Sequence, residues 1–342
     1  MAIVKNTAGI RIPSVYLIEQ DVPPVILGTS TGIIGIVAQF NRGDVNDPTL
    51  VSSQADLERN FGFYDADLDG YAAIINMLNN GAGAVRVCRV SDGEESKASA
   101  TATASASGIV TFTARTPGTW GNYITYTVAQ TGTSSVSSGY VNITITYTPP
   151  NNLAAIETKK YSMLTMDSTV ASGYLVDIIN ADPDRLVDAT RVSTVANTAN
   201  PSVVAATSLS GGDNGSAVGN ALTDADYIGT ASNEGLNAFE AEEFNIDFIT
   251  SPRAYSNATA VGTLQASMIT QVENDNVSPR IAILQPASGM TSANVITLMA
   301  NLDSDRVVMA YPWVKIYNPF ASGGKGREET HAPASHVAGL LS

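Results

Sequence analysis

Charged residues are scarce in this chain, and basic residues are the scarcer kind. Asp, Glu, Lys and Arg make up 15% of its 342 residues, against about 25% in an average soluble domain. The 18 basic and 32 acidic residues leave a formal net charge of −14. Binding to nucleic-acid phosphates requires clustered Lys and Arg, and the sequence contains no such cluster. We therefore predict no nucleic-acid partner, and the low charge suits a surface packed against neighbouring molecules.

Cysteine and histidine are rarer still. Cys88 is the only cysteine, so no disulfide can form within the chain, and its apolar surroundings predict a small buried side chain. The two histidines, His331 and His336, lie far from Cys88 in the sequence and supply no transition-metal ligand set with it. We accordingly predict no metal and no cofactor.

Long apolar runs do not occur either. No stretch approaches the roughly 18 apolar residues of a membrane span, and the N-terminus lacks the charged and then apolar pattern of a signal peptide. The sequence therefore predicts a protein that is made and kept in a cytoplasm, without direct insertion into a membrane.

The first 27 residues predict an extended N-terminal arm. Pro13, Pro23 and Pro24 prevent a helix from running through this segment. The apolar side chains of this arm must be buried. The arm can pack on its own domain, or it can add a strand to a sheet of another subunit. The residues predicted to make the inter-subunit contact are Ile10, Ile12, Val15, Tyr16, Leu17 and Ile18.

Residues 28–97 and 223–342 show the alternation of strands and helices that is typical of an α/β core. Apolar runs predict strands over 32–40, 84–90, 244–250 and 280–285. Helical spacing predicts helices over 54–61, 71–80, 260–272 and 292–302. Ser53 and Gly62 are the expected start and stop signals of the first helix, and Asp69 or Gly70 starts the second.

Residues 98–222 have a different texture, rich in Ser, Thr, Ala and Val. Strict alternation over 110–113 and 141–147 predicts half-buried strands, and one helix is predicted near 174–180. The glycine-rich stretch GGDNGS, residues 211–216, is interpreted as a flexible boundary loop. The fold class predicted is therefore an α/β core, discontinuous in sequence, whose mixed sheet is flanked by helices and which carries an inserted β-rich domain and the N-terminal arm.

The last forty residues begin with a wholly apolar run, Val307 to Tyr311, which predicts a central strand covered on both faces. Pro312 interrupts it, and residues 313–317 resume an extended path. A glycine-rich loop follows, and APASHVAGLLS then predicts the beginning of a helix. Because a core strand lies so near the last residue, we expect a further C-terminal segment to be missing.

Three short motifs suggest chemistry that their context does not support. GTSTG around Ser30 matches the nucleophile elbow of hydrolases and could be combined with His331 or His336, but it leads into a strand instead of a helix. DADLDG, residues 65–70, copies half of a calcium loop, yet Asn76 stands where a glutamate is needed. Helix N-capping by Asp67 and Asp69 is the simpler explanation. Trp120, between turn residues, is interpreted as a packed aromatic residue and not as part of a ligand cage.

Six segments carry a resemblance to a known family. In order they are IRIPSVYLIEQDVPPVILGTSTGIIGIVAQFNRGDVNDPTLVSSQADLERNFG, NMLNNGAGAVRVCRV, TPGTWGNYITYTV, SPRIAILQP, VVMAYPWVKIYNP and APASHVAG. In their order and spacing across nearly the whole chain they resemble the tail sheath proteins of contractile-tailed phages and related injection machines.

The resemblance implies a structural subunit and not an enzyme. Family members form stacked six-membered rings around a tail tube, exchange strands through their terminal arms, and contract to drive the tube through the host envelope. It implies as partners neighbouring sheath subunits, the tail tube protein, and baseplate and tail terminator proteins. It also implies a place in the virion after assembly in the host bacterial cytoplasm. Two alternatives remain open, a serine hydrolase using Ser30 and a surface adhesin that binds through the β-rich residues.

Overall fold

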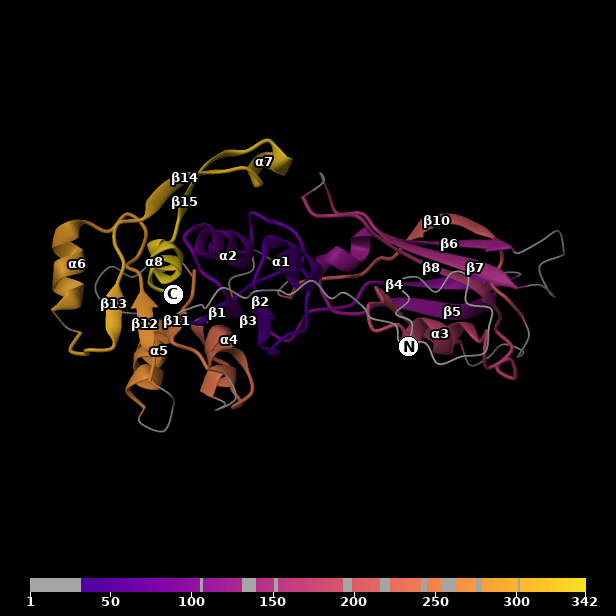
Figure 1. The fold of residues 1–342 in the computed structure, drawn as a ribbon, viewed down its shortest axis with the longest axis horizontal. Coiled ribbons are helices and arrows are strands. Elements are labelled where there is room, and N and C mark those ends of the chain that lie inside the picture. The colour runs from indigo at the N-terminus through magenta and orange to yellow at the C-terminus, as the bar shows by residue number, and fades with distance from the viewer. Residues whose placement is uncertain are drawn as a thin grey trace, which may run out of the picture.

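A six-stranded mixed sheet forms the centre of one half of the molecule (Figure 1). Its strands lie in the order β13-β12-β11-β1-β3-β2, and all neighbours are parallel except β2 and β3. The strands are β1 (Ile34–Ala38), β2 (Thr49–Val51), β3 (Val85–Arg89), β11 (Phe248–Thr250), β12 (Ile281–Leu284) and β13 (Val307–Met309). This computed structural model describes residues 32–104, 107–130, 140–150, 153–192, 199–215, 222–240, 245–253, 262–274, 279–300 and 302–342. The predicted arm and Ser30 lie outside those residues.

Helices cover both faces of this sheet, because the side chains of β1 alternate between two hydrophobic clusters. Ile34 and Ile36 pack against α1, α2 and α8, whereas Val37 packs on the opposite face against α4, η3 and α5. The helices are α1 (Gln54–Phe61), α2 (Gly70–Asn79), α4 (Asp224–Ile228), the 3-10 helix η3 (Gly235–Glu240), α5 (Thr263–Glu273), α6 (Ser292–Met299) and α8 (Pro333–Leu341). The prediction of an α/β core with a mixed, helix-flanked sheet is therefore confirmed.

Local sequence signals account for the ends of the first helices. The Ser53 hydroxyl accepts a hydrogen bond from the Asp56 N–H at 3.2 Å, as an N-cap residue does. Gly62 ends α1 with a φ of 90°, which other residues adopt only under strain. The predicted bounds of this helix are confirmed, and Cys88 is fully buried as predicted.

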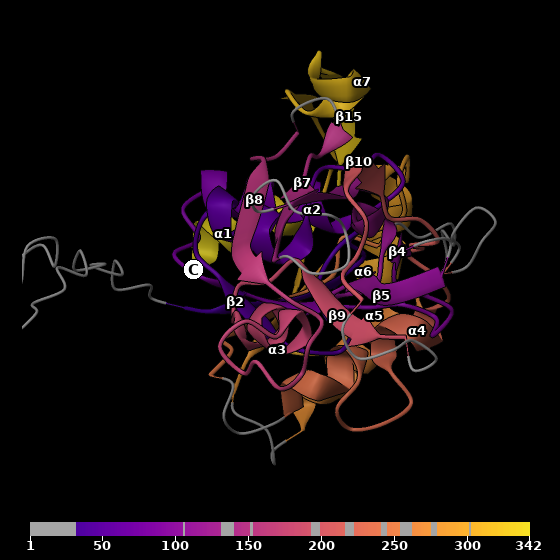
Figure 2. The same ribbon diagram turned by 90° about the vertical axis from the view of Figure 1, so that its right-hand side faces the viewer.

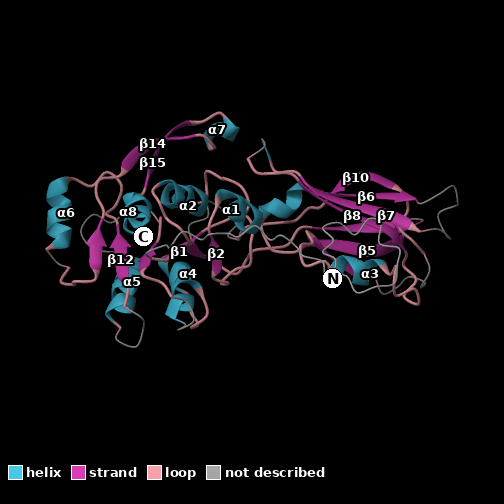
Figure 3. Ribbon diagram, viewed as in Figure 1, coloured by secondary structure: helices cyan, strands magenta, loops and turns pink. Residues whose placement is uncertain are grey.

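Residues 99–208 form the other half, called here the β-rich region, which Figure 3 shows as mostly strand. A four-stranded antiparallel sheet, β10-β6-β7-β8, faces a three-stranded one, β4-β5-β9, across a separate hydrophobic cluster. The elements are β4 (Ser99–Ala104), β5 (Ser107–Ala114), η1 (Thr119–Tyr123), β6 (Ile124–Gln130), β7 (Val141–Tyr147), β8 (Glu157–Leu164), α3 (Leu175–Ala181), β9 (Val187–Arg191) and β10 (Val204–Ser208). The predicted alternation and the helix near 174–180 are confirmed.

Two predictions for individual segments are wrong. The run from Val307 contributes β13, an edge strand whose three side chains are only partly buried, and not a central strand. Residues 211–215 are not a free loop, because Asn122 exchanges two hydrogen bonds with Gly212 and the Asn214 side chain accepts one from the Thr119 N–H. These contacts attach the loop to η1.

Buried arginines join the β-rich region to the sheet. Arg42, which follows β1, forms a 2.6 Å ion pair with Glu157 of β8, and its guanidinium lies 4.3 Å from the centre of the Trp120 ring. Arg89, at the end of β3, donates from Nη1 to the carbonyl groups of Gly43 and Pro117. Trp120 is buried beside a turn, as predicted. The two halves are therefore held together by directional polar contacts.

We expect Arg42→Ala to lower the free energy of unfolding by about 2–4 kcal/mol, because it leaves Glu157 without its partner and removes the contact with Trp120. Arg59→Ala is the matched control, since the exposed Arg59–Asp56 pair contributes less than about 1 kcal/mol. Urea unfolding of both variants measures the difference. Equal losses in the two variants would contradict the role given to Arg42.

Candidate functional site

A two-stranded antiparallel hairpin extends from the α/β half and carries the candidate site. It pairs β14 (Val314–Asn318) with β15 (Arg327–His331), and the short helix α7 (Ala321–Gly324) lies at its tip. Figure 2 shows α7 at the top edge of the ribbon, and Ala321 at its start is buried in the cluster that α1, α2 and α8 share. Within the described residues no third strand pairs with either edge of the hairpin. Each outer edge therefore presents main-chain groups that are able to pair with a further strand.

Side chains alternate between the two faces of the hairpin. The register places Val314 opposite His331 and Ile316 opposite Glu329, on the partly buried face. Lys315, Tyr317, Glu328 and Thr330 occupy the other face, where Tyr317 is 63% exposed. The predicted extended path over 313–317 is confirmed, but its pairing with β15 was not foreseen.

Glu329 anchors the buried face of the hairpin to α2 and its preceding loop. Its carboxylate accepts hydrogen bonds from the Tyr64 hydroxyl at 2.8 Å, the Asn318 amide at 2.7 Å and Arg327 Nε at 2.9 Å. Burial opposes ionisation of Glu329, but these hydrogen bonds outweigh it and lower the pKa of the carboxyl group. The Phe320 ring adds an edge-to-face contact with Tyr71 at 5.3 Å. One face of the hairpin, from the middle of β15 to the residue before α7, is therefore held against α2 and the loop that precedes it.

A groove of about 570 Å³ runs along β15. All five residues of the strand line it, and the opposite wall includes the small side chains of Ala66, Ala72 and Ala73. Because consecutive residues of β15 line the groove, it follows the strand and does not end in a closed pocket. An extended segment lying there would be able to pair with the main chain of β15, as in β-strand addition.

A second cleft, of about 560 Å³, lies where α1 meets the β-rich region. It contains both signs of charge, including Arg59 and Arg115 beside Glu58 and Asp184. The Arg42–Glu157 ion pair belongs to its lining. This cleft lies at the joint between the two halves of the molecule, and its five basic and four acidic lining residues nearly balance, so its charge does not select a ligand.

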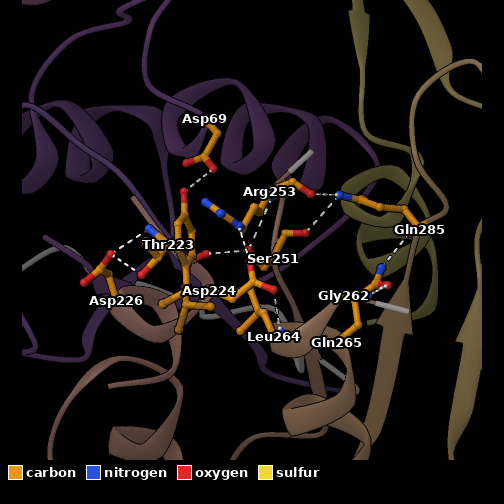
Figure 4. A network of polar contacts seen from close by, with 12 residues as sticks. Asp69, Thr223, Asp224, Asp226, Ser251, Arg253, Gly262, Leu264, Gln265 and Gln285 are labelled. Carbon is orange, nitrogen blue, oxygen red and sulfur yellow. Dashed lines mark hydrogen bonds and ion pairs between the residues drawn. The ribbon is translucent and has the colours of Figure 1, made fainter. Parts of the chain in front are cut away.

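Asp69 lies at the start of α2, as predicted, but it does not cap the helix. Its side chain instead accepts a 2.9 Å hydrogen bond from the Gln39 N–H and a 2.7 Å hydrogen bond from the Tyr227 hydroxyl (Figure 4). Burial raises the pKa of Asp69. Asp67 donates its N–H to Asp65. The capping interpretation is therefore wrong for the Asp69 side chain, which joins β1 to α4.

Figure 4 shows the rest of this polar network beyond the carboxyl ends of the parallel strands. Arg253 Nε contacts Asp224 at 2.6 Å, and the guanidinium lies 4.8 Å from the centre of the Tyr227 ring. Gln285 donates to the carbonyl groups of Ser251 and Arg253. In α/β proteins, ligands usually bind at the carboxyl ends of the parallel strands, at the point in the sheet where the strand order reverses direction. Here the Tyr227 and Arg253 side chains occupy it, so the network connects helices to the sheet.

The histidines that were considered for catalysis lie at the passage from β15 to α8. His331 Nε2 is 3.8 Å from a Glu329 oxygen, and His336 Nδ1 is 3.1 Å from the Asn80 amide nitrogen. Ser30 lies outside the described residues, so the structure provides no contact between Ser30 and either histidine. Within the described ranges no group of His, Cys, Asp and Glu could hold a metal ion. None of the helices described has the length and apolar character to cross a membrane.

The α2–α8 contact is expected to weaken in acid. Burial lowers the pKa of His336 below the ordinary value of 6.5, and the Asn80 amide donates to its unprotonated Nδ1. The unfolded chain then binds a proton at a higher pH than the folded chain, so stability present above pH 6.5 is lost as the pH falls towards the folded pKa.

The variant His336→Gln keeps an acceptor for Asn80 but cannot titrate, so it should flatten the fall in melting temperature between about pH 7 and pH 5. Because burial also lowers the pKa of His331, the variant His331→Gln and the double variant separate the two contributions. An unchanged pH profile in the double variant would contradict this account.

Two solved structures of sheath tail proteins have a fold similar to that of this chain. The sheath tail protein of Listeria innocua is 18% identical, with a TM-score of 0.56 over 91% of this chain and 55% of that one. The sheath tail protein of Desulfitobacterium hafniense is 16% identical, with a TM-score of 0.55 over 96% of this chain and 61% of that one. The present chain thus spans somewhat more than half the length of these proteins.

No family model matches the chain, and no curated protein matches it either. The likeness is therefore one of fold, at low sequence identity, and it extends over both halves of the molecule. It supports the resemblance to tail sheath proteins that the sequence motifs indicated. The chain has the fold of sheath tail proteins.

Proposed function

We propose that the chain is a structural subunit of a contractile tail sheath, and therefore a virion component and not an enzyme. The observation that carries this proposal is the fold, which is similar to two sheath tail proteins over 91% and 96% of the chain. The low charge of the chain and the open edges of the β14–β15 hairpin agree with a protein that binds copies of itself.

In this proposal the hairpin receives strands from neighbouring subunits. The donated segment is the N-terminal arm, residues 1–27, through Ile10, Ile12, Val15, Tyr16, Leu17 and Ile18. Main-chain pairing along β15 would supply affinity, and the small residues that line the groove would leave room for aliphatic side chains. The arm of each subunit would thereby form a strand in a sheet of a neighbouring subunit, so that the polypeptide chain itself links the two subunits.

The larger assembly follows the same proposal. Subunits would stack as six-membered rings around a tail tube, with baseplate and tail terminator proteins at the ends. Contraction would then be a rigid-body rearrangement of subunits that stay linked through their arms. The core would comprise residues 28–97 and 223–342, and residues 98–222 would be an inserted domain pointing away from the tube.

The purified full chain should form ringed or helical tubes that are visible by negative-stain electron microscopy. Deletion of residues 1–20 should abolish the tubes and leave the circular dichroism spectrum and melting temperature of the subunit nearly unchanged. Tubes that form normally after this deletion would exclude strand donation by the arm. Monomers alone, even at high protein concentration, would contradict self-assembly by these 342 residues.

Filling the groove should also block assembly. Ala66 is exposed and lines the groove along β15, so Ala66→Trp adds bulk there without disturbing the core. Ala55→Trp is the matched control, because Ala55 is also exposed but lines the other cleft. Sedimentation velocity should show assembly by the Ala55 variant and a loss of at least about tenfold in apparent affinity, about 1.4 kcal/mol, for the Ala66 variant. Equal assembly by both variants would exclude the groove as the acceptor.

A further inference from the structure

Helix α6 carries an apolar stripe that is wider than the surface against which the described residues bury it. Val295 and Leu298 are buried against the sheet in a small cluster with Met290 and Ala287, and Met309 of β13 packs against it. The helix therefore covers the edge of the sheet that β13 would otherwise expose. Figure 1 places α6 at the end of the long axis farthest from the β-rich region.

The outer part of this apolar stripe is exposed. Ile296 is 70% exposed and Met299 is 36% exposed, and because they are three residues apart they adjoin on the helix surface. Met299 also lies four residues after the buried Val295, so the stripe continues from the inward pair, Val295 and Leu298, round to Ile296. The exposed outward part, which extends beyond the surface that the described residues cover, therefore indicates a second contact.

The absence of charged residues from the segment around α6 favours a second copy of this chain as the partner. No Asp, Glu, Lys or Arg occurs between Arg280 and Asp303, although the whole chain carries a net charge of −14. Two copies of so acidic a chain repel each other wherever their carboxylates approach. A contact through α6 brings no charged side chain of this segment into the interface, so it avoids that repulsion and the cost of burying unpaired charge.

We propose that the outward face of α6, formed by Ile296 and Met299 with Ala293 and Ala300 beside them, is a contact surface for a second copy of this chain. This inference rests on the proposed self-assembly and assigns it an interface separate from the β14–β15 hairpin. The α6 contact is apolar and exchanges no main-chain hydrogen bonds, whereas the hairpin contact pairs strands. The two contacts are therefore separable by mutation.

The test compares Ile296→Glu with Val203→Glu in the full chain. Val203 precedes β10 and is 55% exposed, so the control adds the same charge at a similarly exposed apolar residue far from α6. Light scattering against protein concentration should show a rise of at least about tenfold in the concentration needed for assembly for the Ile296 variant only. The difference should persist at about 0.5 M salt, where charge repulsion is screened.

Ile296→Ser provides a second variant that removes the apolar side chain without adding charge, and circular dichroism checks that each variant folds. If the Ile296 variants assemble like the Val203 variant, the α6 contact is overturned and the proposed sheath function stands. If the unaltered chain does not self-associate, both proposals fail. Loss of assembly in both the Ile296 and the Val203 variants would also overturn the inference, because the effect would then not belong to α6.

Discussion

The partly buried ion pair between Arg42 and Glu157 is the contact from which the joint between the two halves of the molecule is built. It joins two hydrophobic clusters, one around the mixed sheet and one between the sheets of the β-rich region. Apolar contacts alone would let the two halves rotate relative to each other. The Arg42 guanidinium, which pairs with a carboxylate and lies on the Trp120 ring, restricts the halves to one relative orientation. Arg89 adds main-chain contacts on either side of the same joint. A subunit built this way presents its distant surfaces in a constant relation to one another, which assembly into a regular tube requires.

Much of the α/β half could be predicted from the sequence, because its elements carry signals within a few residues. The run from Gly32 to Phe40 is apolar enough to be a central strand, and β1 is one. Ser53 and Gly62 mark both ends of α1. Alternation over residues 141–147 places β7 with every second side chain buried. In each case the local pattern and the tertiary environment demand the same structure.

The features that could not be predicted depend on contacts between residues that are far apart in the sequence. The run from Val307 has the apolar composition of a central strand, but it forms the edge strand β13. Its outer side is covered by α6 and not by another strand. The composition of a strand does not show which kind of element covers it. Asp69 has the sequence position of a cap, yet Tyr227, more than 150 residues away, takes its carboxylate. The groove along β15 exists only because the hairpin lies over α2, which no local signal indicated. Only the alternation from Val314 to Tyr317 hinted at a strand there.

In the proposed assembly, the hairpin and α6 would keep free energy available for association in two different ways. A two-stranded hairpin is only marginally stable in water, and this one is held on one face, by Glu329 in the middle of β15 and by Phe320 near the tip. A third strand would add hydrogen bonds and order the hairpin in the same step, so ordering and assembly become coupled. The α6 face is already ordered, so its contribution would be apolar burial alone. Strand pairing is directional and fixes which surfaces meet, whereas an apolar face tolerates small shifts. In the proposed sheath, subunits that move while they stay linked would use contacts of both kinds.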